Sequence, residues 1–181
     1  MRKTIFGVTV ECVKEDIASQ RGITAVVNAA NAQLRIGGGV AGAIHRAAGP
    51  ELEKECCPLA PIKPGEAVIT GGHNLPNRHV IHCLGPVYGI DKPEVELLAK
   101  CYRNALQLAE QHKIDSIAFP AISTGAFGYP VVEAAEVAFR TILETIHKLK
   151  HVKRIRFVLY GDRDLHIHEQ MLSRILAQEK P

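Results

Sequence analysis

Short apolar runs alternate along this chain with segments of helical periodicity, and this alternation restricts the fold more than any other feature. The runs rich in β-branched residues are typical of buried strands and fall at residues 23–27, 67–70, 79–84, 116–119 and 156–160. Residues 6–12 instead alternate apolar and polar side chains, which predicts a half-exposed first strand. Apolar stripes of helical period run through 98–112, 134–149 and 165–175, and Pro93 and Pro130 suit the opening turns of the first two.

Strands that alternate with helices predict an α/β fold whose helices cover both faces of a central sheet. No long helix separates the first predicted strand from the second, which suits an antiparallel edge on a mixed, mostly parallel sheet. The proline-rich stretch at residues 58–64 is too short for a linker between domains. We therefore expect one domain over residues 1–181.

Composition and charge exclude several protein classes. Hydrophobic residues make up 46% of the 181 residues, but their longest runs fall far below the about 20 residues of a membrane span. Five cysteines, an odd number without a Cys-x-x-Cys pair, indicate reduced thiols and a cytoplasmic protein. A net charge of +3 is too small to indicate nucleic acid, although it is compatible with an anionic ligand. His79 and His82 would point to opposite faces of a strand, so we expect neither a metal ion nor another cofactor.

Two glycine-bearing loops follow predicted strands and lead into predicted helices. Gly37, Gly38 and Gly39 precede a small-residue helix, and residues 120–128 precede the helix at Pro130. In open α/β sheets, ligands bind beyond the carboxyl ends of the strands, and helix N-termini offer unpaired N–H groups to anions. The two loops are therefore expected to bracket a diphosphate at one edge of the sheet.

These loops do not fit three common active-site motifs. Gly37, Gly39 and Gly42 satisfy Gly-x-Gly-x-x-Gly, but residues 28–36 separate them from the strand and no acidic strand end follows. Neither loop continues into Gly-Lys-Ser/Thr, and Ser123 lacks the Gly-x-Ser-x-Gly setting of a hydrolase nucleophile. We therefore expect no Rossmann, Walker or α/β-hydrolase site.

Several spaced segments together resemble the macro domain family. They are Val26-Val27-Asn28-Ala29-Ala30-Asn31, Gly37-Gly38-Gly39-Val40, Gly42 to Gly49, Gly65-Glu66-Ala67, Val80-Ile81-His82, Gly85 to Tyr88 and Ala118 to Gly125. They occur in the family's order, and the resemblance covers nearly the whole chain, from Phe6 to Leu172, which makes it specific. It implies a three-layer α/β/α sandwich that binds ADP-ribose in a cleft at the carboxyl edge of the sheet.

The resemblance implies residue roles at the adenine and diphosphate end of that ligand. Asp16 is similar to an aspartate that accepts a hydrogen bond from the adenine amine, with Ile17 beside the ring. The family usually has glycine where this chain has Glu15. Tyr160 resembles the aromatic residue that packs on adenine. Backbone N–H groups of two segments would bind the diphosphate, namely Gly37, Gly38, Gly39 and Val40, and Ser123, Thr124, Gly125, Ala126 and Phe127.

At the distal ribose, the resemblance implies a small set of binding and catalytic residues. Phe127 would lie over this ribose, and Asn31 would hydrogen-bond its hydroxyl groups. Asn28 is included among the expected binding residues. His45 joins Asn31 and Phe127 as a catalytic candidate.

Structural interpretations of the same side chains stay open at this point. Asn28 and Asn31 could each close a turn through side-chain bonds to the backbone. Asp16 could cap a helix that begins at the next residue, and Tyr160 could belong to the core. His45 faces either the ligand pocket or the sheet.

We expect a protein that binds ADP-ribose and hydrolyses ADP-ribosyl esters, either mono-ADP-ribose on Asp or Glu or O-acetyl-ADP-ribose. MacroD-type hydrolases carry an aspartate after Gly-Gly-Gly-Val, where this chain has Ala41, so it resembles archaeal and viral members more closely. A water would then be held by the substrate phosphate and the loop backbone.

The alternative function is a non-catalytic reader of mono-ADP-ribosylated proteins or of poly(ADP-ribose). Basic residues near Lys150 and Arg154 could contribute to binding a polymer. The expected partners are ADP-ribose, its derivatives and ADP-ribosylated proteins, with neither nucleic acid nor a membrane. We expect the protein to be a monomer.

Overall fold

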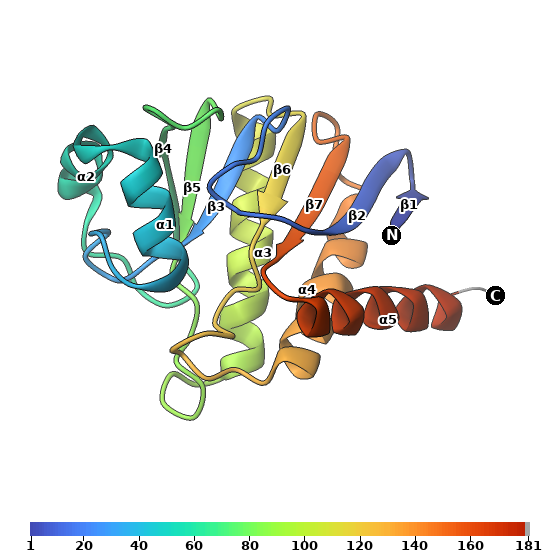
Figure 1. The fold of residues 1–181 in the computed structure, drawn as a ribbon. Coiled ribbons are helices and arrows are strands. Elements are labelled where there is room, and N and C mark those ends of the chain that lie inside the picture. Colours follow the sequence, from blue (N-terminus) through green and yellow to red (C-terminus); the bar gives the residue numbers. More distant parts are fainter. Residues whose placement is uncertain (180–181) are drawn as a thin grey trace.

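The computed structural model describes residues 1–179 (Figure 1). Within them, seven strands form one sheet in the order β1-β2-β7-β6-β3-β5-β4. The bounds of β1 to β7 are Arg2–Ile5, Val8–Lys14, Ala25–Ala29, Ala67–Gly71, His79–Cys83, Ser116–Phe119 and Arg154–Leu159. The edge strands β1 and β4 pair antiparallel with their neighbours, and the inner strands pair parallel. The predicted mixed, mostly parallel sheet is confirmed.

Helices cover both faces of this sheet, as the alternating pattern predicts (Figure 1). One layer holds α1 (Gly39–Ala48), α2 (Pro50–Cys56) and the short 3-10 helix η1 (Cys57–Leu59). The other holds α3 (Glu94–Gln111), α4 (Val131–Ile146) and α5 (Asp162–Gln178). The three-layer α/β/α sandwich is therefore confirmed. None of the helices described is long and apolar enough to cross a membrane.

Side chains along each inner strand alternate between two apolar cores. Val27 and Ile81 pack in the core beneath α3, α4 and α5, whereas Val26 and Val80 pack in the core beneath α1 and α2. This follows from the pleat, which directs successive side chains to opposite faces of a sheet. Because both faces are buried, the strands have continuous apolar runs rather than alternating ones.

The N-terminal segment differs from the single strand predicted over residues 6–12. Phe6 and Gly7 have positive φ angles of 48° and 78° and form the turn of a hairpin between β1 and β2. As a result β1 is the antiparallel edge, and β2 is an inner strand parallel to β7. The alternating pattern continues through the turn, and phenylalanine rarely adopts a positive φ, so the sequence gives no indication of a turn here.

Smaller boundary shifts also affect the site. The strand predicted at residues 23–27 is β3 at Ala25–Ala29, so Asn28 lies inside the strand rather than in the loop after it. β7 ends at Leu159 and leaves Tyr160 just beyond the strand. Pro93 and Pro130 are the N-cap residues of α3 and α4 rather than members of their first turns.

Candidate functional site

Two neighbouring cavities form one cleft along the carboxyl edge of the parallel strands. The glycine-loop cavity, about 320 Å³, is lined by Ala29, Ala30, Asn31, Gly37, Gly38, Gly39, Val40, Ala41, Gly85, Ala121, Ile122, Ser123, Gly125, Ala126 and Phe127. The Tyr160 cavity, about 560 Å³, is lined by Glu15, Asp16, Ile17, Gly39, Val40, Ala43, Arg46, Pro120, Ala121, Thr124, Gly125, Val158, Leu159, Tyr160 and Asp164. Gly39, Val40, Ala121 and Gly125 line both cavities, so the cleft is continuous.

The N-terminus of α1 opens into the glycine-loop cavity. Its N-cap, Gly38, provides no side-chain cap, and the first turn carries no acidic residue. The first N–H groups of the helix therefore have no side-chain partner, and the positive end of the helix dipole lies there. A Cβ at Gly42 would overlap the carbonyl oxygen of Gly37, so helix and loop approach as closely as glycine allows. This part of the cleft suits an anion.

The second loop contributes backbone to the cleft but no helix N-terminus. Ser123 has a φ of 67°, and its buried Oγ has no hydrogen-bond partner within residues 1–179. A Cβ at Gly85 would overlap the Ser123 and Ile122 side chains, so only glycine fits against this loop. α4 begins at Val131, which lines neither cavity. The expectation that both helix N-termini open into the cleft is therefore wrong for α4, and only α1 presents its N-terminus there.

Asn31 lines the glycine-loop cavity and also fixes the loop that follows β3. Its Nδ2 donates to the carbonyl of Arg35 at 2.8 Å, and its Oδ1 accepts from the N–H of Arg35 at 3.0 Å. A Cβ at Gly37 would lie only 3.2 Å from the same Nδ2. The turn-closing interpretation of Asn31 is thus correct, and the side chain nevertheless lines the cavity.

Asp16, Ile17 and Tyr160 all line the Tyr160 cavity. Tyr160 is 94% exposed, so the interpretation of this ring as a core residue is wrong. The Asp16 Oδ1 accepts a hydrogen bond of 2.9 Å from the N–H of Ala18 in a turn, and no helix begins at Ile17. The aromatic face of Tyr160 is therefore free to pack on a ring, and Asp16 is held by the turn.

An ion network around the buried Glu11 supports the loop that carries Asp16. We use this name for Glu11, Arg2, Arg154, Arg156 and Gln20. Glu11 Oε1 accepts from Nε of Arg154 at 2.7 Å and of Arg156 at 2.8 Å, and its Oε2 pairs with Arg2 at 3.0 Å. Burial would raise the pKa of Glu11, but the hydrogen bonds from Arg154 and Arg156 bring it down to about 2. Arg154 is therefore part of this network and not of a free basic face.

The ion network reaches the cleft through Gln20. Arg156 Nη1 donates to Gln20 Oε1 at 3.0 Å, and Gln20 Nε2 donates to the Asp16 carbonyl at 2.8 Å. Glu15 accepts from the same Nε2 at 3.0 Å and lies 3.6 Å from Arg156. The glutamate that stands where the family usually has glycine therefore ties the loop to the sheet.

Asn28 and His45 are not brought into the cleft. Asn28 is fully buried, and its Nδ2 lies 3.1 Å from Nδ1 of His82. His45 is 4% exposed, its ring lies on the sheet side of α1, 6.3 Å from the His82 ring, and its Nε2 has no partner in the described part of the chain. Burial lowers the pKa of His45, which favours the neutral ring. Neither residue lines a cavity of the cleft.

The sequence prediction missed Arg46, which is exposed and lines the Tyr160 cavity. Gly39, Ala43 and Arg46 are spaced four and three residues apart, and residues at this spacing share one face of a helix. Because Gly39 was already expected to bind the diphosphate, this spacing could have indicated that Ala43 and Arg46 also face the cleft. Asp164, in the first turn of α5, gave no comparable signal.

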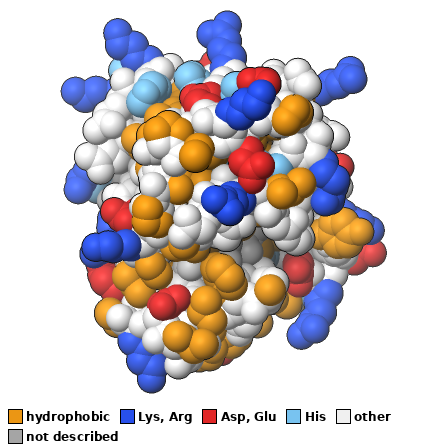
Figure 2. All heavy atoms as spheres, turned by 90° about the vertical axis from the view of Figure 1, so that its left-hand side faces the viewer, with side chains coloured by type: hydrophobic (Ala, Val, Ile, Leu, Met, Phe, Trp, Pro, Cys, Tyr) orange, Lys and Arg blue, Asp and Glu red, His pale blue; other side chains and the backbone are white. Residues whose placement is uncertain are grey.

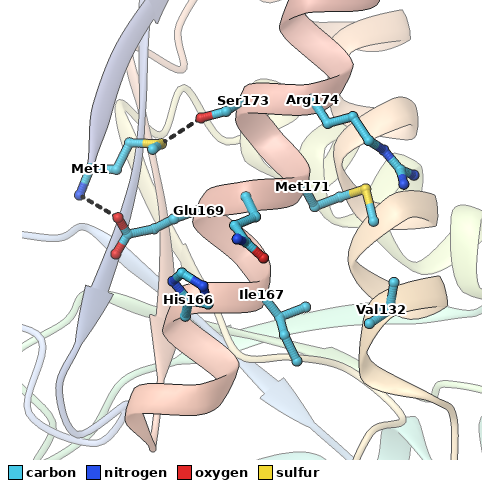
Figure 3. Close-up of a pocket in the computed structure, with 9 residues that line it drawn as sticks. Met1, Val132, His166, Ile167, Glu169, Met171, Ser173 and Arg174 are labelled. Carbon is cyan, nitrogen blue, oxygen red and sulfur yellow. Dashed lines mark hydrogen bonds and ion pairs between the residues drawn. The ribbon is translucent and has the colours of Figure 1, made fainter.

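A separate cavity of about 600 Å³ lies between Met1, α5 and Val132 at the start of α4 (Figure 3). Ser173 Oγ bonds the Met1 sulfur at 3.6 Å, and the N-terminal amino group lies 4.0 Å from Glu169. None of the predicted site residues lines this cavity. Within residues 1–179, no three His, Cys, Asp or Glu side chains are arranged to hold a metal ion.

The comparisons with known proteins agree with this geometry. The family described as "Macro domain" matches residues 27–138. An O-acetyl-ADP-ribose deacetylase of Salmonella typhimurium is 45% identical over 170 residues, which cover 91% of this chain and 94% of that protein. A macrodomain of Oceanobacillus iheyensis, solved with ADP, has a TM-score of 0.94 at 42% identity, with 98% and 97% of the two chains covered. A Trypanosoma brucei macrodomain solved with ADP-ribose has a TM-score of 0.83 at 33% identity, with 89% and 68% covered.

Proposed function

This chain belongs to the macro domain family, and on that premise we propose that its cleft binds ADP-ribose and hydrolyses ADP-ribosyl esters. One observation carries the proposal. A cavity with an exposed aromatic ring and a carboxylate, Tyr160 and Asp16, is continuous with a cavity at the uncapped N-terminus of α1. Along the cleft, the aromatic ring and carboxylate suit adenine, the helix N-terminus suits the diphosphate, and the glycine-loop cavity beyond it suits the distal ribose. This is the order of these groups in ADP-ribose. The similar Salmonella protein is named for the hydrolysis of such an ester.

The proposed ligand position follows the lining residues. Adenine packs between Tyr160 and Ile17, and Asp16 accepts a hydrogen bond from its amine. The diphosphate lies where the two cavities join, over the backbone of Gly39 and Gly125. The distal ribose enters the glycine-loop cavity.

In the glycine-loop cavity, Asn31 binds the ribose hydroxyl groups and Phe127 covers the ring. The carbonyl of Phe127 accepts from the N–H of Tyr88 at 2.8 Å, which connects this end of the cleft to the loop after β5. Tyr88 and Ile90 of that loop are 46% and 75% exposed. Figure 2 shows apolar side chains gathered on the lower part of the face it presents. The exposed side chains of Tyr88 and Ile90 suit contact with a protein attached to the ribose.

The chemistry requires a positioned water rather than a strong acid. Water attacks the anomeric carbon of the distal ribose, and the bond from this carbon to the ester oxygen breaks. The carboxylate leaves with that electron pair, the ribose keeps the hydroxyl group from the water, and the second proton of the water is released. Asn31 and Ser123 are the polar side chains that line the glycine-loop cavity, and Ala41 stands where MacroD-type enzymes carry an aspartate. Because a carboxylate is a good leaving group, alignment of the water, worth about 7–11 kcal/mol at best, and N–H donors, worth about 3–4 kcal/mol each, suffice for slow turnover.

The proposal extends to the protein's setting. We propose that residues 1–181 form one macro domain, that it acts in the cytoplasm, and that its partners are ADP-ribosylated proteins. A second candidate function is a non-catalytic reader of these proteins. It is favoured by the absence of an acidic side chain among the residues that line the glycine-loop cavity.

The deciding experiment is a timed incubation with a glutamate-linked mono-ADP-ribosylated protein, and in parallel with O-acetyl-ADP-ribose, followed by chromatography of free ADP-ribose. We expect release by the wild type and at least about tenfold slower release by Asn31→Ala, because the ribose loses its alignment. Asn104→Ala, on α3 and outside the cleft, is the matched control and keeps full activity.

Binding is measured beside turnover by calorimetry with ADP-ribose. Asp16→Ala is expected to weaken binding by about 10- to 100-fold, the range for losing a hydrogen bond to a charged group. Tight binding by the wild type without release of ADP-ribose would make the protein a reader. Unchanged affinity of Asp16→Ala would contradict the adenine assignment.

A further inference from the structure

Three adjacent strands carry a row of buried polar side chains beneath α1 and α2. Thr70 on β4, His82 on β5 and Asn28 on β3 are each at most 3% exposed. Asn28 and His82 are direct partners in the β3–β5 pairing. His82 Nδ1 lies 3.1 Å from Asn28 Nδ2, and His82 Nε2 lies 2.9 Å from Thr70 Oγ1. Both nitrogens of the His82 ring therefore have a partner.

The carbonyl of Gly71 sets a direction for the hydrogens in this row. It lies 3.1 Å from the Thr70 hydroxyl and can only accept, and a hydroxyl that donates to it accepts in turn from His82 Nε2–H. In this arrangement His82 Nδ1 accepts a hydrogen from Asn28 Nδ2. Burial lowers the pKa of His82 to about 3, which keeps the ring neutral and this assignment valid at neutral pH. We call Thr70, His82 and Asn28 the neutral chain.

Two polar atoms at the end of the neutral chain have no partner within residues 1–179. They are Oδ1 of Asn28 and Nε2 of His45, and both are buried. Leaving such a group unpaired costs about 1–3 kcal/mol. The His45 ring lies 6.3 Å from the His82 ring that Asn28 contacts. Because the Asn28 oxygen can only accept, a direct hydrogen bond from Nε2–H of His45 would give both atoms a partner.

We propose that the neutral chain fixes His45 as its Nε2–H tautomer and positions the glycine-loop cavity for turnover. Asn28 lies on β3, whose last residue, Ala29, lines that cavity. His45 lies on α1, whose first residues, Gly39 to Ala41, also line that cavity. The chain thus connects the two elements that hold Asn31 and the glycine loop. Thr70, His82, Asn28 and His45 are positioning residues here, and the catalytic part of this inference rests on the proposed function.

Thr70→Val tests the direction of the chain, with Thr70→Ser as its matched control. Valine has the shape of threonine but cannot accept from His82 Nε2–H, whereas serine retains the hydroxyl. Nitrogen-15 spectra of the imidazole rings report which ring nitrogen carries hydrogen. We expect His82 and His45 of the wild type and of Thr70→Ser to carry it on Nε2. In Thr70→Val, His82 should move its hydrogen to Nδ1, the Asn28 amide should turn over, and His45 should change tautomer with it.

Cys56→Ala provides a second control for the same spectra. Its sulfur lies 3.6 Å from His82 Nε2, farther than the Thr70 oxygen, so its removal should leave both tautomers unchanged. The wild-type spectrum alone overturns the chain if either His82 or His45 carries its hydrogen on Nδ1 at neutral pH. The wild-type spectrum therefore tests the direction of the chain even if none of the variants folds.

Turnover is measured on the same variants. Thr70→Val should lower kcat for ester hydrolysis by about tenfold, the scale of a small misplacement of reacting groups. ADP-ribose affinity should stay unchanged, and Thr70→Ser should restore kcat. A changed tautomer with unchanged kcat would overturn the positioning role. Absence of turnover in the wild type would instead overturn the proposed hydrolase, and the tautomer spectra would still decide on the chain.

Discussion

Two polar clusters, each centred on a buried side chain, lie on the same face of the sheet and support the two halves of the cleft by different means. The neutral chain lies behind the glycine-loop cavity and contains no ionised group. The ion network lies behind the Tyr160 cavity and centres on an ionised carboxylate, Glu11, with three arginine partners. Both clusters fill the positions at which apolar side chains would otherwise pack. One face of one sheet therefore holds two kinds of polar interior.

The difference follows from what covers each half of that face. α1 and α2 lie over β3, β5 and β4, where a charge would lose its water on all sides (Figure 1). No helix of the described chain lies on this face over β2 and β7 (Figure 1). The side chains of Arg2 and Arg154 there are 66% and 34% exposed and keep part of their hydration. Charges persist where one partner reaches solvent, and neutral hydrogen bonds replace them where none does.

Replacement of Glu11 should have the largest effect on stability, because it removes the only carboxylate at the centre of the ion network. Glu11→Gln keeps the shape of the side chain but leaves Arg154 and Arg156 without a counter-charge. We expect the free energy of unfolding, measured by urea denaturation, to fall by about 2–3 kcal/mol, below the 3–5 kcal/mol of fully buried pairs because two arginines are partly hydrated. Glu136→Gln, in half-exposed pairs with Arg140 and Arg174, is the matched control, with an expected loss below about 1 kcal/mol. An equal loss in both variants would mean that the network does not stabilise the fold.

The pH dependence of stability should separate the two clusters. His82 has its pKa lowered by burial from 6.5 to about 3, so between these values only the unfolded chain binds the proton, and stability falls as pH falls. Glu11, with its pKa lowered from 4.5 to about 2, loses its contribution as pH falls below 4.5. For each group, the free energy of unfolding falls by at most about 1.4 kcal/mol per pH unit.

The variants assign each pH window to its cluster. His82→Gln should flatten the upper window, and Glu11→Gln only the lower one, in urea titrations at a series of pH values. His45 and His168, whose pKa values burial also lowers, leave a residual slope in the upper window. A slope above pH 4.5 that His82→Gln leaves untouched would show that His82 is protonated in the folded protein.

The smallest expected effect concerns the exposed member of the ion network. Arg2 pairs with Glu11 Oε2, while Arg154 and Arg156 continue to pair with Oε1 in its absence. Arg2→Ala should therefore lower the free energy of unfolding by less than about 1 kcal/mol, as for other exposed pairs. Urea denaturation beside Glu11→Gln measures it. A loss as large as that of Glu11→Gln would mean that solvent contact does not distinguish the two halves of the face.

Local patterns predicted the parts of the site that depend on local geometry. The glycine loop before α1 and the loop after β6 were recognised because close approach of a backbone demands glycine, whatever surrounds it. Arg46 was missed because its place in the cleft depends on how α1 lies across the sheet. Asn28 was expected at the ligand because the predicted end of β3 was two residues too early. Asn31 has both of its predicted contacts, with the turn and with the cavity, and its role in binding remains a prediction.

Local sequence patterns were enough to predict the alternation of strands and helices and the two loops at the carboxyl edge, because pleat, helical period and glycine freedom act within a few residues. The polar side chains inside the fold find their partners only through the tertiary structure. The Asn28–His82 contact joins residues 54 positions apart, and the contacts of Glu11 with Arg154 and Arg156 span 143 and 145 positions. These partners meet because the sheet places β3 beside β5 and β2 beside β7. Whether each cluster is charged then depends on whether helices cover it, and a local sequence pattern does not show which part of the sheet a helix covers.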